Sequence, residues 1–395
     1  MRREAEAALG PQMEVHCVRD GLGFAALRGE WTALIERGQA SPFLRWEWLY
    51  PWWNRLHPER TPLLLVAREG AGSLVGILPL SAAVTRVGGV AARRLSWLGE
   101  DLVGSDYLDV LSVPGSEDRV GRAFGQWLGR WSGGWDVLEL HDVEKGAPGT
   151  AALLAELPGT HAVVRSERFT CPGRTFIPGE PFDLFLRRTA RRDNYLRRRK
   201  WLERQPGHAL QITREPGALS APLGSFFHLH ARRWASEGGS QGIRGPRVEA
   251  FHREATRLLA ETGLLRLYTL KVGGEAVASV YAINDRGTFS YYQGGYAPEW
   301  GSKSVGLVLV GETFRDAIES GCTRYDFLRG TEGYKADWVD GARHTEALCV
   351  LAPTLAARAY AASLEMQRVG RGLVKSLLPV RLKERIQRSR RQVVH

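Results

Sequence analysis

The residues best suited to chemistry lie in the segment 287–338. Aromatic residues at 289–292 favour a strand, and the helical pattern that follows begins with Ser304 and Gly306 and meets a capping glycine, Gly321. A helix that starts just after a strand presents free backbone N–H groups and the positive end of its dipole. Such a helix start suits an anion, for example a pyrophosphate.

The elements around that segment occur twice in the chain. Two strands joined by a glycine turn are predicted at 63–78 and again at 265–281. A helix, a glycine stop and a strand are predicted at 124–138 and again at 314–328. The period is about 190 to 200 residues, which is too long for a solenoid repeat and indicates a duplicated domain.

We therefore expect an α/β fold with mixed sheets (α+β), built from two tandem lobes. The lobes are expected at 13–175 and 176–350, with a linker where Pro and Gly interrupt the chain at 172–181. A disordered extension is expected at 1–12 and a basic helical tail at 351–395. The first lobe opens with helices whose expected core residues are Trp31, Leu34, Trp48 and Trp52.

Length and composition suit a cytoplasmic enzyme. The chain has 395 residues, of which 44% are hydrophobic, enough for two cores of ordinary domain size. Its four cysteines lie far apart with no Cys-x-x-Cys pair, which argues against a structural metal site and against a disulfide framework. Neither a signal peptide nor an apolar run near the roughly 20 residues of a membrane span is readable. We expect a cytoplasmic protein without a metal.

The net charge of +11 is concentrated in two runs, 187–204 and 368–391, and the rest of the chain is slightly acidic. The first run is either a solvated helix face or a surface for an anionic substrate or carrier, such as a lipid-linked sugar phosphate or an RNA. In the second run, leucines alternate with basic residues. It is either a terminal helix packed on its own domain or an amphipathic helix that rests on anionic membrane lipid.

One combination of motifs is specific enough to suggest a family. An aromatic strand ends in Gly294, and the chain continues with Ser304-x-Gly306, a helix, Gly321, Asp326-Phe327-x-Arg329-Gly330 and Tyr334-Lys335-x-x-Trp338. This pattern resembles the bacterial acyltransferases of the GNAT superfamily that are grouped with cellulose and exopolysaccharide biosynthesis, the CelD/BcsL type. Those are similar in turn to the Fem-type peptidyltransferases. The resemblance covers most of residues 13–350 and implies two GNAT-like lobes.

The resemblance also implies a reaction, with the chemistry in the second lobe. Acyl-CoA, for example acetyl-CoA, would serve as donor co-substrate, and a small-molecule or glycan acceptor would attack the thioester directly, in polysaccharide or cell-envelope biosynthesis. The backbone around Ser304 and Gly306, with Lys303, would hold the pyrophosphate. The strand edge near Gln293 and Gly294 would polarise the thioester carbonyl.

Three residues are candidates for handling protons in such a reaction. Asp326 would act as base or orient the acceptor amine, unless it only pairs with Arg329. His230 has an imidazole of useful pKa, although a lone histidine on a helix is often a packed or surface residue. Tyr334 is a candidate acid for the leaving thiolate.

Four further residues are candidates for binding substrate. Arg329 and Lys335 have pKa values too high for easy proton exchange and are better suited to an anionic group on the acceptor or donor. Trp234 and Tyr292 are candidate acceptor contacts.

Two other functions stay open. A Fem-like transferase that uses aminoacyl-tRNA would employ the basic run 187–204 for RNA, although the second lobe lacks the long coiled-coil insertion that some of that family carry. A non-catalytic partner of a polysaccharide-assembly complex is the other, since duplicated lobes often lose activity in one copy.

Overall fold

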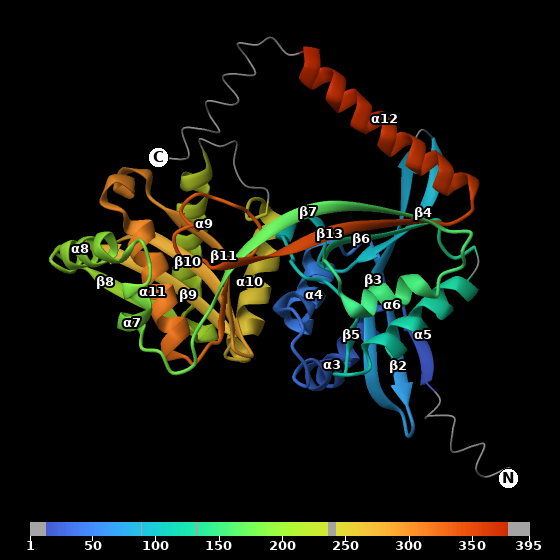
Figure 1. Cartoon of the computed structure of the whole chain (residues 1–395), viewed down its shortest axis with the longest axis horizontal. Coiled ribbons are helices and arrows are strands. Elements are labelled where there is room, and N and C mark those ends of the chain that lie inside the picture. Colours follow the sequence, from blue (N-terminus) through green and yellow to red (C-terminus); the bar gives the residue numbers. More distant parts are fainter. Residues whose placement is uncertain (1–12, 88, 132, 236–241, 378–395) are drawn as a thin grey trace. The chain divides into compact units, whose positions relative to one another are not determined.

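The computed structural model places the chain in two compact units, drawn in Figure 1. Unit 1 comprises the chain from its first strand to Asp101, the segment Ser105–Arg168, and the chain from Thr345 to the end of the last helix. Unit 2 comprises Leu102–Gly104 and Phe169–His344. The structure describes residues 13–87, 89–131, 133–235 and 242–377.

Unit 1 is built on a sheet of six strands in the order β1 (Met13–Val18), β2 (Thr61–Glu69), β3 (Ser73–Val87), β4 (Val90–Trp97), β6 (Val137–Glu144) and β13 (Gly341–Leu351), with β5 (Leu111–Ser112) beside β3. The neighbours are antiparallel except for β4 and β6, which are parallel. Gly70 and Gly72 have positive φ angles in the β2–β3 turn, which confirms the predicted glycine hairpin.

The helices of unit 1 are α2 (Gly21–Ala26), α3 (Arg28–Ile35), α4 (Trp46–Pro51), α5 (Glu117–Arg130), α6 (Pro148–Ala155) and α12 (Leu355–Leu377), with short turns η1 (Pro42–Leu44) and η2 (Trp52–Leu56). The four residues expected in this core are all buried, each no more than 2% exposed: Trp31, Leu34, Trp48 and Trp52. The indole N–H groups of the three tryptophans find acceptors, for example Leu44 O for Trp31. A buried tryptophan needs such a partner.

Unit 2 has a sheet of six strands in the order β7 (Ala162–Thr175), β12 (Arg324–Asp326), β11 (Thr288–Tyr296), β10 (Glu275–Asp285), β9 (Leu265–Val272) and β8 (Ala209–Thr213). Here β11 and β12 are the parallel pair, and the other neighbours are antiparallel. Gly273 and Gly274 form the β9–β10 turn with positive φ, as the sequence predicted.

The helices of unit 2 are α7 (Phe182–Arg187), α8 (Arg192–Glu203), α9 (Ser220–Trp234), α10 (Pro246–Glu261) and α11 (Val305–Glu319). Helices α7, α8 and α11 share one core with the sheet, while α9 contacts β9, β10 and β11 outside that core (Figure 1). The centre of the α11 core is a stack of rings. Phe314 lies 3.8 Å from Tyr325, 4.9 Å from Trp338 and 5.3 Å from Phe185, between ring centroids.

The two units share one strand order, which agrees with a duplicated, mixed α/β lobe. In each unit, one strand of the parallel pair has a strand from a distant part of the chain on its other side. Strand β13 takes that place next to β6, and β7 takes it next to β12. This exchange of strands was not predicted from the sequence, because residues 172–181 were assigned to a linker. The first part of that segment is strand up to Thr175, where Pro172 only has to accept, through its carbonyl, the N–H of Phe327.

Some expectations fall on residues that the structure leaves undescribed. The extension 1–12 lies outside the described residues, and so do the side chains of the proposed membrane-contact run 368–391. Within the described part of the chain, no helix combines the length and the apolar character that crossing a bilayer requires.

Candidate functional site

The parallel pair of unit 2 separates after three residues. Strands β11 and β12 pair from Thr288 and Arg324 to Ser290 and Asp326. Strand β12 then ends, whereas β11 continues to Tyr296. The edge of β11 that faced β12 therefore continues beyond the last paired residue. Backbone groups on such a strand edge can donate and accept hydrogen bonds to a ligand that lies along the strand.

A β-bulge lies in that continuing part of β11. Consecutive residues of β10, Tyr281 and Ala282, pair with Gln293 and Tyr291, so that Tyr292 is the extra residue. A bulge re-aims side chains, and here two successive residues face the helices α9 and α10. The Tyr292 ring lies 5.7 Å from the His252 ring, and the Gln293 amide meets His230.

His230 is held tightly against the bulge. Its Nε2 lies 3.3 Å from Gln293 Oε1, and the residue is 2% exposed. Burial lowers the pKa of His230 to about 4, despite the opposing hydrogen bond with Gln293, so the ring is neutral at pH 7. A Cβ on Gly295 would lie 2.4 Å from the backbone nitrogen of His230, so only glycine permits this approach of α9 to β11.

On the α11 side of β11, the structure brings Tyr334 to Gly294. The Tyr291 hydroxyl reaches so near the backbone that a Cβ on Gly294 would lie 2.1 Å from it. The hydroxyl groups of Tyr291 and Tyr334 are hydrogen-bonded to each other, and burial raises the pKa of both. The Tyr334 side chain is 42% exposed overall, so its outer edge faces solvent while its hydroxyl points inward. The pair of phenols was not evident from the sequence.

The start of α11 has the features expected of an anion site. Ser304 follows η6 (Pro298–Lys303) in a left-handed conformation, φ 58° and ψ 36°, and its side chain makes no capping hydrogen bond. The first helical bond runs from Val308 N–H to Ser304 O. The N–H groups of the first turn therefore have no acceptor inside the helix. Lys303 lies beside this turn, with its Nζ 5.3 Å from the centre of the Trp201 ring.

Gly306 places no side chain over that first turn. The backbone conformation at this position does not require glycine. Its φ is not positive, and an added Cβ would meet the Tyr296 ring at an ordinary 3.6 Å. Glycine at this position removes bulk beside the N–H groups. The left-handed residue is the neighbouring serine.

The contacts of Asp326 indicate a structural role. It is 1% exposed, and its Oδ1 accepts the N–H of Leu328 at 2.8 Å. Its Oδ2 lies 3.6 Å from Arg324 Nε and 3.7 Å from a guanidinium nitrogen of Arg343. These two arginines were not foreseen as partners. The expected partner, Arg329, places its guanidinium over the Phe169 ring at 4.5 Å.

The surroundings of Lys335 correct the expectation that this residue binds an anionic group of the substrate. It is 3% exposed, and its Nζ donates to the carbonyl oxygens of Phe327, Arg329 and Gly330 at 3.0 to 3.3 Å. Its carboxylate partner is Glu332 at 2.8 Å. The ammonium group is therefore enclosed and holds the loop after β12.

A cleft of about 720 Å³ opens beside α9. Its walls are one face of α9 from Gly224 to Arg232, the β9–β10 turn, and the chain from Ala297 to Trp300 that leads to α11. Trp234 follows on the same helix, with its ring 6.1 Å from that of His230. Among the described residues, no three His, Cys, Asp or Glu side chains are grouped so as to hold a metal ion.

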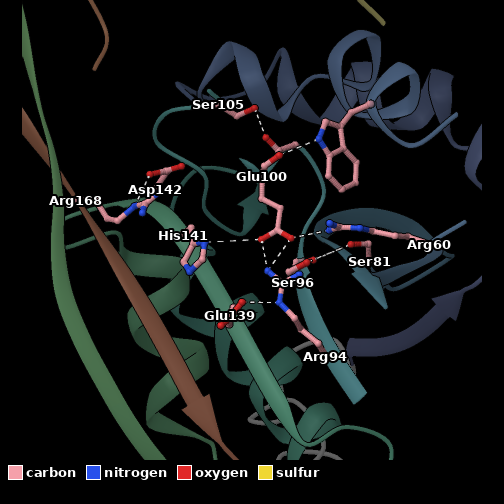
Figure 2. A network of polar contacts seen from close by, with 12 residues as sticks. Arg60, Ser81, Arg94, Ser96, Glu100, Ser105, Glu139, His141, Asp142 and Arg168 are labelled. Atoms are coloured by element: carbon pink, nitrogen blue, oxygen red, sulfur yellow. Dashed lines mark hydrogen bonds and ion pairs between the residues drawn. The ribbon is translucent and has the colours of Figure 1, made fainter. Parts of the chain in front are cut away.

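The matching place in unit 1 is filled by charged groups (Figure 2). Strands β4 and β6 also pair over three residues, the last being Ser96 and Glu139, and β4 then ends at Trp97. Figure 2 shows the Glu100 carboxylate beyond that point, between side chains of β4 and β6. Glu100 is fully buried and lies 2.7 Å from Arg60 and 2.9 Å from Arg94.

Glu139, which occupies the strand position of Asp326, completes this network. Burial opposes its charge, but the neighbouring Arg94 and a hydrogen bond from Tyr360 leave its pKa below the usual value. The Tyr360 hydroxyl of α12 donates to Glu139 at 2.7 Å. Paired charges thus occupy in unit 1 the region that corresponds to the part of β11 beyond its pairing with β12 in unit 2, and the features expected of a donor site are found in unit 2.

Residues 189–336 match the family described as acetyltransferase (GNAT) domain, and every candidate residue discussed above for unit 2 lies within this range. This part of the chain is a GNAT acetyltransferase domain. The protein is accordingly an acyltransferase. No curated protein sequence matches the chain.

Solved structures resemble the chain over most of its length. FemX has a TM-score of 0.58 at 10% identity, covering 86% of this chain and 98% of FemX. The C-terminal domain of a putative lysylphosphatidylglycerol synthetase from Agrobacterium fabrum has 0.52 at 9% identity, covering 86% and 95%. L-PGS from Bacillus licheniformis has 0.50 at 13% identity, covering 85% and 95%. At these identities the likeness shows the fold alone, and the match with FemX extends over most of the chain.

Proposed function

We propose that the protein is an acyl-CoA-dependent N-acyltransferase that transfers an acyl group, such as acetyl, directly to an amine or sugar acceptor. The observation that carries this proposal is the edge of β11 that continues past the bulge to Tyr296, whose ring lies beside Gly306 in the uncapped first turn of α11. The strand edge offers hydrogen bonds to an extended pantetheine chain, and the helix start offers N–H groups to a pyrophosphate.

In this proposal the chain binds and orients the reactants. The first-turn N–H groups of α11, with Lys303, hold the pyrophosphate, and a backbone N–H near Gly294 polarises the thioester carbonyl. The donor supplies an activated acyl group, so no covalent bond to the protein is required. The acceptor nitrogen forms the new bond to the acyl carbon as the carbon–sulfur bond breaks.

In this proposal the pair of phenols, Tyr291 and Tyr334, carries the proton released by the nitrogen to the sulfur. Tyr334 receives that proton and gives its own hydroxyl proton to the leaving thiolate, with Tyr291 as hydrogen-bond partner, so that charge is balanced at each end. His230, with a pKa of about 4, is a poor proton acceptor from an ammonium group. Its role in the proposal is to position Gln293 at the bulge.

The acceptor side of the proposal is supported by the cleft beside α9. The cleft is lined by Leu229, the neighbour of His230 on α9, and by Ala297, which follows the end of β11. A glycan or small-molecule acceptor in polysaccharide or cell-envelope biosynthesis is the proposed class, and for it the motif resemblance is the support.

A turnover assay tests the proposal. The purified chain is incubated with acetyl-CoA and panels of amines, amino sugars and nucleotide sugars, and released thiol is followed while products are identified by mass. We expect acceptor-dependent thiol release that Tyr334→Phe lowers by about 10² or more. Transfer from aminoacyl-tRNA with no transfer from any acyl-CoA would replace this proposal with the Fem-like one.

A further inference from the structure

The basic helix α8 lies against the helix whose start forms the anion site. The Tyr195 hydroxyl donates to Glu312 of α11 at 2.6 Å, and Arg199 Nε lies 3.0 Å from the same carboxylate. Tyr195 also packs on Gly311, where a Cβ would lie 2.2 Å from its ring. These contacts fix α8 on the surface of α11.

The end of α8 reaches the first turn of α11. Lys303, the residue before Ser304, places its Nζ 5.3 Å from the centre of the Trp201 ring. Trp201 is partly buried and packs against the core that contains α11. Side chains on the same face of α8 as Trp201 are therefore close to the proposed pyrophosphate position.

That face of α8 is strongly basic. Helical spacing of three or four residues places Arg197, Arg198 and Arg204 around Trp201. The acidic side chains of α8 are engaged elsewhere, Asp193 with Arg192 and Glu203 with Arg199.

One of these arginines has spare hydrogen-bonding capacity. Arg198 Nε is buried and makes no hydrogen bond within the described part of the chain. With Lys303, the face gathers four cations next to a helix start that is itself positive. Like charges gathered in this way repel one another in the free protein, and an anion would relieve the repulsion.

The donor in the proposed function carries a further phosphate, apart from the pyrophosphate that is assigned to the helix start. Coenzyme A has a pyrophosphate and, on the adenosine ribose, a separate 3′-phosphate. The N–H groups of the first turn of α11 are already assigned to the pyrophosphate. A dianionic monoester nearby requires charged side chains, and arginine binds phosphate oxygens in a bidentate manner.

We propose that the α8 cation face, defined as Arg197, Arg198, Arg204 and Lys303, binds the ribose 3′-phosphate of the acyl-CoA donor. This inference rests on the proposed function and extends its donor site to the basic run that the sequence left open between a solvated face and an anion-binding surface. It assigns the run to a nucleotide phosphate.

The test compares two ligands that differ only at that phosphate. Binding of acetyl-CoA and of 3′-dephospho-acetyl-CoA to the full chain is measured by calorimetry. We expect the wild-type protein to bind acetyl-CoA at least tenfold more tightly. In Arg198→Gln/Arg204→Gln, acetyl-CoA should bind about tenfold more weakly while 3′-dephospho-acetyl-CoA binds as before, so that the difference between the ligands disappears.

Arg192→Gln is the matched control. Nine helical positions separate Arg192 from Trp201, so it lies on the opposite side of α8, where it pairs with Asp193. It should change neither affinity. Unchanged melting temperatures establish that the variants are folded, and Arg204→Glu provides a single-site version in which the loss for acetyl-CoA should be larger.

The outcomes separate this inference from the proposed function. Equal affinity of the wild type for both ligands overturns the inference and leaves the donor proposal intact. Failure of both ligands to bind overturns the two together. If the double variant loses affinity for tRNA and keeps its affinity for acetyl-CoA, the face binds RNA and the inference is wrong.

Discussion

At the scale of single residues, burial decides which polar groups perform chemistry and which maintain structure. Asp326 is the clearest case, because its carboxylate is enclosed by a backbone N–H and two arginines. A carboxylate held in this way is well placed to fix the chain after β12. Tyr334, whose hydroxyl meets Tyr291 beside Gly294, is better placed for the reaction.

Replacing Asp326 by Asn should therefore lower stability more than it alters the reaction. Removing one member of a buried charge pair costs roughly 3 to 5 kcal/mol, and because Asn keeps the hydrogen bond from Leu328 we expect the lower end of that range. Denaturant unfolding measures it. Asp193→Asn, in an exposed pair, should cost less than about 1 kcal/mol. Normal stability of the Asp326 variant with turnover reduced a hundredfold would instead make the aspartate catalytic.

The buried histidines predict a particular response to pH. Burial lowers the pKa of both His230 and His252 to about 4, from 6.5. Between these values the unfolded chain binds more protons than the folded one, so stability is complete above pH 6.5 and falls as pH decreases toward 4, by on the order of 3 kcal/mol for each histidine.

Melting temperatures of the wild type and of His230→Gln between pH 4 and 7.5 test this. The variant should show a smaller decrease than the wild type across the window. Parallel curves for the two proteins would mean that His230 titrates normally in the folded state.

At the scale of elements, glycines set how closely α9 approaches β11. We expect Gly295→Ala to cost about 1 to 3 kcal/mol, because its methyl group would overlap the backbone of His230. Gly306→Ala is the matched control in the same unit. Its methyl group finds ordinary space, and alanine is favoured over glycine in a helix by about 1 kcal/mol, so stability should be equal or higher. The denaturant midpoint should fall for Gly295→Ala and stay equal or rise for Gly306→Ala, and equal shifts would show that the close approach is unimportant.

Elements formed by neighbouring residues were predictable from sequence, and those formed by distant ones were not. The two glycine hairpins, the helix after Ser304 and its end near Gly321 follow from local patterns, and the structure confirms them. The bulge at Tyr292 depends on pairing with β10, which no local pattern reports. The pairing of Asp326 with Arg343 likewise requires the fold, and so does the Tyr291–Tyr334 pair.

At the scale of the whole molecule, each unit depends on a strand from elsewhere in the chain. Unit 1 is completed by β13, α12 and the short connection between them, which provide the edge pairing of β6, the Tyr360 bond to Glu139 and the Thr354 bond to Asp136. Unit 2 is completed by β7. Each lobe therefore consists of separate segments, and a cut at one point in the sequence removes part of a sheet.

A chain that ends at His344 should show this dependence. It lacks most of β13 and all of α12, so β6 becomes an unprotected edge and Glu139 loses a hydrogen bond. We expect the backbone amides of β6 to exchange hydrogen at least tenfold faster than in the full chain, while amides of β9 and β10 in unit 2 keep their protection. Unchanged protection of β6 would mean that unit 1 folds without its C-terminal strand.

The most direct test of the proposed donor site is a calorimetric titration of the full chain with acetyl-CoA. The wild type should bind one molecule per chain, since the features of a donor site occur in unit 2 and charged groups fill the matching region of unit 1. Gly306→Asp should bind at least tenfold more weakly, about 1.4 kcal/mol, because its carboxylate faces the pyrophosphate, while its melting temperature stays equal or rises, since an acid in the first turn favours a helix. Unchanged affinity in the folded Gly306→Asp protein, or two molecules bound per chain, would contradict the assignment of the donor site to the start of α11.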